Sequence, residues 1–134
     1  MDSELRLTIA RLARRMRQER AEADLGPSQL GVLIALAVRG PQTLGELSTH
    51  ERVTAPSMNR TVNLLEASGL LARAASPFDG RKVIIDLTDA GHALVDETKR
   101  RRDAWFAERL SSLSDHERAV LDAALPVLRK LAEE

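Results

Sequence analysis

The chain has 134 residues, a length typical of one domain with its own hydrophobic core. Its 20 basic and 20 acidic residues give a net charge of zero, so it lacks the basic excess that usually marks a nucleic-acid-binding domain. Cysteine is absent, which excludes disulfides, thiolate metal sites and a cysteine redox switch.

The N-terminal part predicts two helices. Apolar residues recur at helical spacing in the first of them: Leu5, Ile9, Leu12 and Met16. This spacing predicts an amphipathic helix over residues 3–23. Gly26-Pro27 begins a second helix, which ends at Gly40-Pro41. Its apolar run, residues 30–38, is too short to span a bilayer and predicts a buried helix.

The next segment predicts two short capped helices joined by a turn. Thr43 and Glu46 have the spacing of a capping box at the start of the first. The second begins near Thr54 with Pro56 in its first turn, where a missing N–H costs nothing. Gly69 ends it, because glycine tolerates the left-handed conformation there.

The second of these helices has two different faces. One side is suited to burial and carries Met58, Thr61, Val62 and Leu65. The other carries Pro56, Asn59, Arg60 and Asn63, with Ser57 at the flank. Short polar donors of this kind suit base edges and phosphates. A solvated amphipathic helix that binds nothing is the alternative.

A hairpin follows, with strands expected at Leu71–Ala75 and Lys82–Leu87. The turn between them is Ser-Pro-Phe-Asp-Gly-Arg, rich in turn-forming residues. Arg81 lies where the turn rejoins the strand, and a projecting arginine suits a narrow minor groove. Asp79 could pair with Arg81 and fix its direction; the alternative is an ordinary hairpin ion pair without a ligand.

The C-terminal third predicts two more helices. Thr88 caps a long helix that runs to about residue 110 and carries Trp105 and Phe106. Ser114 with Glu117 opens the last one, in which Pro126 predicts a kink or a break. Its apolar residues are Val120, Leu121, Leu125, Leu128 and Leu131.

The runs LLEASGLLAR and PFDGRKVIIDLTDAG resemble the MarR family of winged helix-turn-helix regulators. The resemblance rests on Leu65-Glu66, Gly69-Leu70-Leu71, Arg73, Asp79, Arg81, Leu87-Thr88 and Gly91. It extends over most of the chain, because the flanking helices have the expected order and length. One departure is Ser76, which stands where the family has an acidic residue in the wing.

The resemblance implies a mainly α fold with a small β-hairpin wing. We expect a single MarR-like domain over residues 1–134, with the winged helix-turn-helix at 28–88 and dimerisation helices at 1–24 and 89–134. The expected DNA-contacting residues are Thr54, Pro56, Ser57, Asn59, Arg60, Asn63, Asp79 and Arg81. The expected dimer contacts are Leu5, Ile9, Leu12, Trp105, Leu125 and Leu128. Alternatively, these apolar residues fill a core within one chain.

The expected function is sequence-specific binding of double-stranded DNA by a homodimeric, ligand-responsive repressor on a pseudo-palindromic operator. The resemblance implies a small aromatic or carboxylate effector, and an arginine could pair with its carboxylate. Candidates lie in the run 99–102 and among Arg11, Arg14, Arg15 and Arg17, where a solvated helix face is the alternative. No cofactor is expected, and His50, His92 and His116 lack metal-ligand spacing.

Two other functional classes are alternatives to a DNA-binding regulator. An enzyme is not expected, because the sequence has no nucleophile elbow, phosphate-binding loop, dinucleotide fingerprint or metal motif. A winged helix used only for protein contact would present an apolar face in place of Asn59, Arg60 and Asn63. The charged N-terminus has no apolar signal core, so we expect a cytoplasmic protein without a membrane partner.

Overall fold

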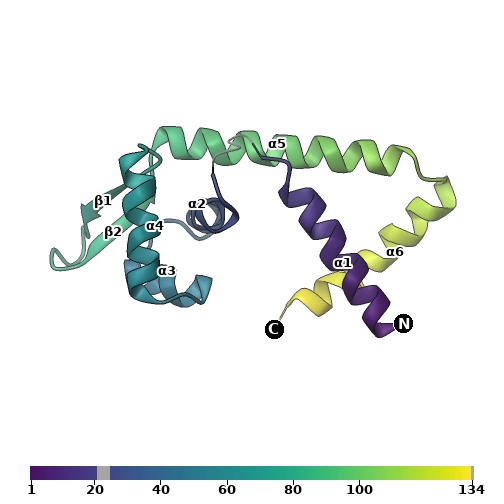
Figure 1. Ribbon diagram of the computed structural model, residues 1–134, viewed down its shortest axis with the longest axis horizontal. Helices are drawn as coiled ribbons and strands as arrows, with labels where there is room; N and C mark the ends of the chain where they lie inside the picture. Colours follow the sequence, from purple (N-terminus) through teal and green to yellow (C-terminus); the bar gives the residue numbers. More distant parts are fainter. Residues whose placement is uncertain (21–24, 134) are drawn as a thin grey trace.

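The computed structural model describes residues 1–20 and 25–133, with the chain folded mainly into helices (Figure 1). In chain order the elements are α1 (Asp2–Arg17), α2 (Pro27–Arg39), α3 (Leu44–Glu51), α4 (Ala55–Ala67), β1 (Leu71–Ala75), β2 (Val83–Leu87), α5 (Asp89–Ser111) and α6 (Asp115–Ala132). The mainly α fold with a two-stranded antiparallel hairpin confirms the predicted fold class. No helix in the described ranges is both long and apolar enough to cross a membrane.

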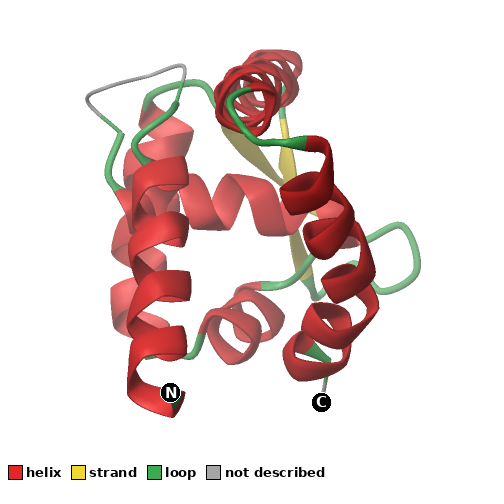
Figure 2. Cartoon of the chain, turned by 90° about the vertical axis from the view of Figure 1, so that its right-hand side faces the viewer, coloured by secondary structure: helices red, strands yellow, loops and turns green. Residues whose placement is uncertain are grey.

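Helix α5 is a long rod that carries a different group of elements at each end (Figure 1). Helices α2, α3 and α4 and the hairpin gather at its N-terminal end, while α1 and α6 lie under its C-terminal half. Both chain termini belong to the group formed by α1 and α6. Helices α1 and α6 overlap in Figure 1, but Figure 2 shows them on opposite sides of the molecule.

The predicted helix starts are present as hydrogen-bonded caps. The hydroxyl of Thr43 accepts from the backbone N–H of Glu46 at 3.2 Å, and the Glu46 carboxylate accepts from the Thr43 N–H at 3.3 Å. Ser114 and Glu117 repeat this capping box on α6. Each cap satisfies backbone N–H groups that a helix start leaves unpaired. These local bonds explain why the sequence pattern located the starts.

The hairpin pairs Leu71 with Leu87 and Ala75 with Val83 in antiparallel register. The second strand begins at Val83, one residue later than predicted. Gln42, just before α3, forms a further bridge to Ile85: each residue donates its N–H to the other's carbonyl, at 3.0 and 2.7 Å. No local sequence pattern indicates this bridge. The bridge ties the hairpin to the start of the helix pair.

The core lies entirely in the half that contains α2, α3, α4 and the hairpin, together with Leu25. Its most deeply buried side chains include Leu33, Leu36, Leu47, Val62 and Ile85. Truncating one such leucine to alanine costs roughly 2–5 kcal/mol. The helix pair and the wing are therefore held as one rigid body.

The corner where α4, β1 and α5 meet depends on two glycines. Gly69 ends α4 with a φ of 76°, the left-handed conformation predicted for it. Gly91, in the first turn of α5, has no room for a side chain, because a Cβ there would overlap the carbonyl oxygen of Leu70. Thr88 fixes the same corner by donating its hydroxyl to the Gly69 carbonyl at 2.6 Å. Steric constraints thus explain why glycine occupies both motif positions.

Two predictions for the terminal helices are wrong in detail. Helix α1 ends at Arg17, so the expected helix over 3–23 is too long; residues 21–23 lie outside the described residues. The carbonyls of Glu19 and Arg20 instead accept hydrogen bonds from side chains of α5, which draw the chain out of the helix. Helix α6 continues through Pro126, so of the predicted kink or break the break is wrong. The carbonyl that loses its partner there belongs to exposed Asp122, so water can satisfy it.

Candidate nucleic-acid interface

Helix α4 presents a polar face to solvent. Met58, Val62 and Leu65 are buried, which confirms the predicted apolar side. The residues expected to contact DNA lie on the remaining surface: Pro56, Asn59, Arg60 and Asn63 are exposed and Ser57 is half-buried. Thr54 is the N-cap, and its hydroxyl oxygen accepts from the Ser57 N–H at 3.3 Å. Its hydroxyl proton remains available to a second acceptor.

Asn59 is held by a residue that the sequence analysis did not place in the site. Arg73, on β1, donates to the side-chain oxygen of Asn59 at 3.0 Å. The other end of the same guanidinium donates to the Glu66 carboxylate at 2.7 Å. Arg73 and Glu66 were noted only as family motif residues, since nothing in the local pattern showed that they meet Asn59.

The turn before α4 contributes two more polar groups. His50 lies in the last turn of α3, and its Nδ1 is 2.7 Å from the side-chain oxygen of Gln42. Gln42 is buried. Because an amide oxygen only accepts, the ring donates from Nδ1 and leaves Nε2 for other partners. Arg52 follows α3 in the left-handed conformation with a φ of 55°, which is uncommon for a residue with a side chain. The sequence pattern did not indicate this conformation.

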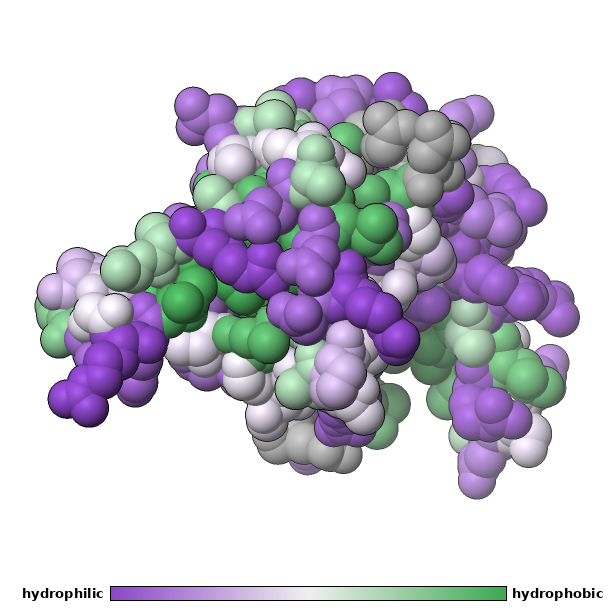
Figure 3. All heavy atoms as spheres, turned by 60° about the vertical axis from the view of Figure 1, so that its left-hand side comes forward, coloured by the Kyte–Doolittle hydropathy of each residue, from purple (hydrophilic) through white to green (hydrophobic). Residues whose placement is uncertain are grey.

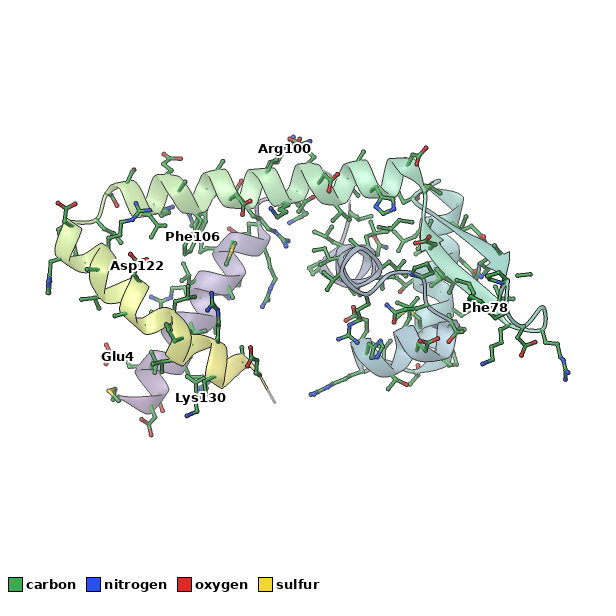
Figure 4. The ribbon with its side chains drawn as sticks, turned by 180° about the vertical axis from the view of Figure 1, so that it is seen from behind. Glu4, Phe78, Arg100, Phe106, Asp122 and Lys130 are labelled. Carbon is green, nitrogen blue, oxygen red and sulfur yellow. The ribbon has the colours of Figure 1, made fainter. Side chains whose placement is uncertain are left out.

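The wing tip is braced by its own side chains. The hydroxyl of Ser76 accepts from the backbone N–H groups of Phe78 and Asp79, at 3.2 and 3.3 Å. Asp79 in turn accepts from the backbone N–H of Arg81 at 3.1 Å. The serine that departs from the family pattern therefore still supplies the acceptor that orders the turn. Phe78 is 98% exposed at this tip, away from the core (Figure 4).

The expected ion pair between Asp79 and Arg81 is absent among the residues that the structure describes. The Asp79 carboxylate is turned to the Arg81 backbone, because a carboxylate two residues before an amide closes a tight turn. The Arg81 guanidinium is exposed. The alternative reading as a plain hairpin ion pair is wrong for the same reason.

This half exposes several cationic side chains although the whole chain is neutral. Arg52, Arg60, Arg81 and Lys82 are exposed, and no salt bridge within the described ranges engages them. Two of the nearby acidic side chains have partners within this half. Glu66 pairs with Arg73, and hydrogen bonds from Thr43 lower the pKa of the Glu46 carboxyl. Figure 3 shows hydrophilic side chains at the tip of the projecting wing.

Comparison with known proteins decides what this arrangement is. The profile of the MarR family matches residues 23–82. An uncharacterized HTH-type transcriptional regulator of Mycobacterium bovis is 38% identical over 132 residues, which cover 98% of this chain and 92% of the relative. The chain belongs to the MarR family. It is accordingly a DNA-binding transcriptional regulator with a winged helix-turn-helix.

Two further likenesses support this placement. The HTH-type transcriptional repressor MdtR of Bacillus subtilis is 29% identical over 135 residues, covering 98% of this chain and 85% of the repressor. A mutant of MepR from S. aureus, solved bound to an oligodeoxyribonucleotide, matches the fold with a TM-score of 0.73, 22% identity and 99% coverage of both chains.

The terminal helices of this MarR-family chain carry exposed apolar surface. Ile9 is 42% exposed and Leu125 is 46% exposed, and Leu5, Leu12 and Leu128 are similar. Neither α1 nor α6 has a buried residue, so these side chains do not fill a core within the described chain. Trp105 and Phe106 are half-buried, with ring centroids 6.3 Å apart. Figure 4 shows Phe106 on the side of α5 that faces α1 and α6, opposite Arg100.

A cleft of about 410 Å³ lies where α1, α2 and α5 meet in this regulator. Three arginines line it, Arg17, Arg20 and Arg102, beside the apolar side chains of Leu30 and Ile34. The pKa of Arg102 is below its ordinary value, first because burial disfavours the charged form and then because Arg17 and Arg20 repel it. The cleft combines a concentrated positive charge with an apolar wall.

Proposed function

We propose that this regulator acts in the cytoplasm as a homodimeric repressor. Helix α4 of each subunit occupies the major groove of one half-site, and the wing contacts the adjacent minor groove. A small carboxylate ligand releases the dimer from its pseudo-palindromic operator. The observation that carries the proposal is the division of α4 into a fully buried apolar side and an exposed side that bears Asn59, Arg60 and Asn63.

The charge distribution supports DNA contact at this face. Arg60 on α4 and Arg81 on the wing are exposed, and no acidic side chain in the described ranges pairs with them. Groups of this kind fit base edges and phosphates in the major groove and the negative potential of a narrow minor groove. The rigid core beneath them keeps helix and wing in one relative position. MepR, which shares the fold, has been solved with an oligodeoxyribonucleotide.

The terminal helices support dimerisation. Their leucines and isoleucine are exposed in a single chain, and burying such a stripe against a second copy removes it from water. A symmetric dimer would place two copies of α4 about one turn of DNA apart, which fits a palindromic operator. The proposed division of the chain is therefore residues 28–88 for DNA and 1–24 with 89–134 for dimerisation.

The arginine-lined cleft supports control by a ligand. A carboxylate would neutralise the repulsion among Arg17, Arg20 and Arg102, and an aromatic ring would pack against Ile34. The cleft lies between the dimerisation helices and α2, where a ligand can alter the angle between the two halves. Repression is proposed by analogy with MdtR, a relative named as a repressor.

The test uses a duplex that the wild-type protein selects from a random library. We expect Arg60→Ala to weaken binding about 5- to 150-fold if Arg60 reads a base, because one good base contact is worth roughly 1–3 kcal/mol. Arg100→Ala is the matched control, since Arg100 is equally charged but lies on the outer side of α5 (Figure 4). Equal affinities of wild type and Arg60→Ala would show that Arg60 does not contact the operator, and the same result for Asn59→Ala as well would rule out the placement of α4 in the major groove.

A further inference from the structure

Arg73 connects strand β1 with the exposed face of α4. Its guanidinium donates to the Asn59 side-chain oxygen at 3.0 Å and to the Glu66 carboxylate at 2.7 Å. Asn59 and Glu66 are seven residues apart, which places them two turns apart on one side of the helix. One rigid, planar group from the hairpin therefore bridges two turns of α4.

This bridge determines how Asn59 is oriented. Arginine offers only donors, so it must meet the oxygen of the asparagine amide and not its nitrogen. With the oxygen held by Arg73, the NH2 group of Asn59 faces away from it. Asn59 is exposed, so this NH2 group is presented on the outer surface of α4.

We propose that Arg73 is a positioning residue for base recognition. By holding the side-chain oxygen of Asn59, it makes Asn59 a hydrogen-bond donor toward the major groove. The acceptors there are the N7 atoms of purines, O6 of guanine and O4 of thymine. A guanine, with two adjacent acceptors, is the base that best fits an outward NH2 group. This inference rests on the proposed function, which places α4 in the major groove.

The charge of Arg73 supports a positioning role over a phosphate contact. Its guanidinium is neutralised by Glu66 at 2.7 Å, and its side chain is 26% exposed. Partly exposed ion pairs contribute little to stability. Loss of Arg73 should therefore change the pattern of base preference while the salt dependence of binding stays the same.

The test is a double-mutant cycle on the duplex selected by the wild-type protein, with Arg73→Gln and Asn59→Ala. Each single variant should bind about 5- to 10-fold more weakly. If Arg73 acts through Asn59, adding Arg73→Gln to Asn59→Ala should cost no further affinity. Additive losses would overturn the proposal. Thermal unfolding of all four proteins verifies that the variants are folded.

A charge exchange keeps the test informative if Arg73→Gln is unstable. The double variant Glu66→Arg with Arg73→Glu keeps an ion pair between α4 and β1, but the introduced carboxylate can only accept. It would draw the Asn59 NH2 group inward and turn the oxygen toward the groove, where adenine N6 and cytosine N4 are the donors. Library selection should then shift one operator position from guanine to adenine or cytosine. An unchanged selected sequence would contradict the inference.

A separate control distinguishes this inference from the proposed function. If Arg60→Ala and Asn59→Ala both bind like wild type, the major-groove placement of α4 is wrong and the inference falls with it. If both weaken binding but the Arg73→Gln loss is additive, only the positioning role of Arg73 is wrong. The slope of affinity against salt should fall for Arg60→Ala if Arg60 meets a phosphate, and stay unchanged for Arg73→Gln.

Discussion

At the scale of single residues, the wing shows how a turn can leave an arginine unpaired. The acceptors in the turn, Ser76 and Asp79, are both bonded to backbone N–H groups. The Asp79 carboxylate therefore lies near Arg81 without neutralising its guanidinium at close range. Because the turn is braced, its backbone loses little entropy when the wing enters a groove, and only the Arg81 side chain has to be ordered.

We expect Arg81→Ala to weaken operator and nonspecific DNA together, because minor-groove contacts carry little sequence information. The slope of log affinity against log salt should fall by about 0.9, the loss of one phosphate-like contact. Asp79→Ala should have a milder effect, since the turn loosens while the cation remains. A salt titration of all three proteins measures this, and a wild-type slope in Arg81→Ala would show that the wing does not touch DNA.

At the scale of secondary elements, two helix caps lead us to expect a contribution to stability that depends on pH. The pKa of Glu46 lies below its ordinary value of 4.5, chiefly because its carboxylate accepts a hydrogen bond from the Thr43 backbone. The pKa of Glu117 is lowered by Ser114 in the same way. Folding thus favours the charged form of both carboxyls. Their stabilisation is present above pH 4.5 and is lost as the pH falls through the lower folded-state pKa.

Glu46→Gln should therefore flatten the decline of the melting temperature between about pH 5 and pH 3. The amide can still cap the helix, but it has no charge to lose. Glu108→Gln, at an exposed carboxylate of α5, is the matched control and should follow the wild-type curve. Parallel curves for Glu46→Gln and wild type would show that the capping box does not contribute to acid sensitivity.

The elements that could be predicted from sequence are those set by local contacts. The caps at Thr43, Thr54 and Ser114 and the left-handed Gly69 depend on residues a few positions apart, so their spacing was readable. Tertiary contacts decided the rest. The end of α1, the bridge from Gln42 to Ile85 and the Arg73 contact with Asn59 join residues that are distant in sequence.

At the scale of the whole molecule, the two halves differ in how they are stabilised. The winged half has a closed core, whereas α1 and α6 have no buried residue of their own. Exposed apolar stripes of this kind are unfavourable in water and favour association. We therefore propose that α1 and α6 complete their packing against a second copy of the chain.

The double variant Ile9→Glu with Leu125→Glu should abolish dimerisation, because an unpaired charge in an apolar contact costs several kcal/mol. Sedimentation at micromolar concentration should give twice the mass of the chain for wild type and a monomer or aggregate for the variant. Phe78→Glu changes an equally apolar, 98% exposed residue on the wing and should remain dimeric. A wild-type protein that sediments as a monomer and still binds its operator would contradict the dimer.

The arginine cleft predicts a ligand response that depends on Arg102. Benzoate, the simplest aromatic carboxylate, should lower operator affinity of the wild type at millimolar concentration. Arg102→Gln should bind DNA normally and lose this response, since it removes one of the three cations. Arg100→Gln, two residues earlier but salt-bridged to Glu97, should respond like wild type. Equal responses in all three proteins would place the effector elsewhere.

We propose that helix α5 transmits ligand binding to the DNA-contacting half as a change in tilt. Its 23 residues span roughly 34 Å at 1.5 Å per residue, with the arginine-lined cleft near its middle and the winged half at its N-terminal end. The 13 residues from Arg102 in the cleft back to Asp89 span roughly 20 Å, so a tilt of about 10° about the cleft moves the N-terminal end of α5 by roughly 3 Å, about one base-pair step of DNA. The two α4 helices of a dimer can therefore lose register with the operator while every contact inside each winged half stays intact.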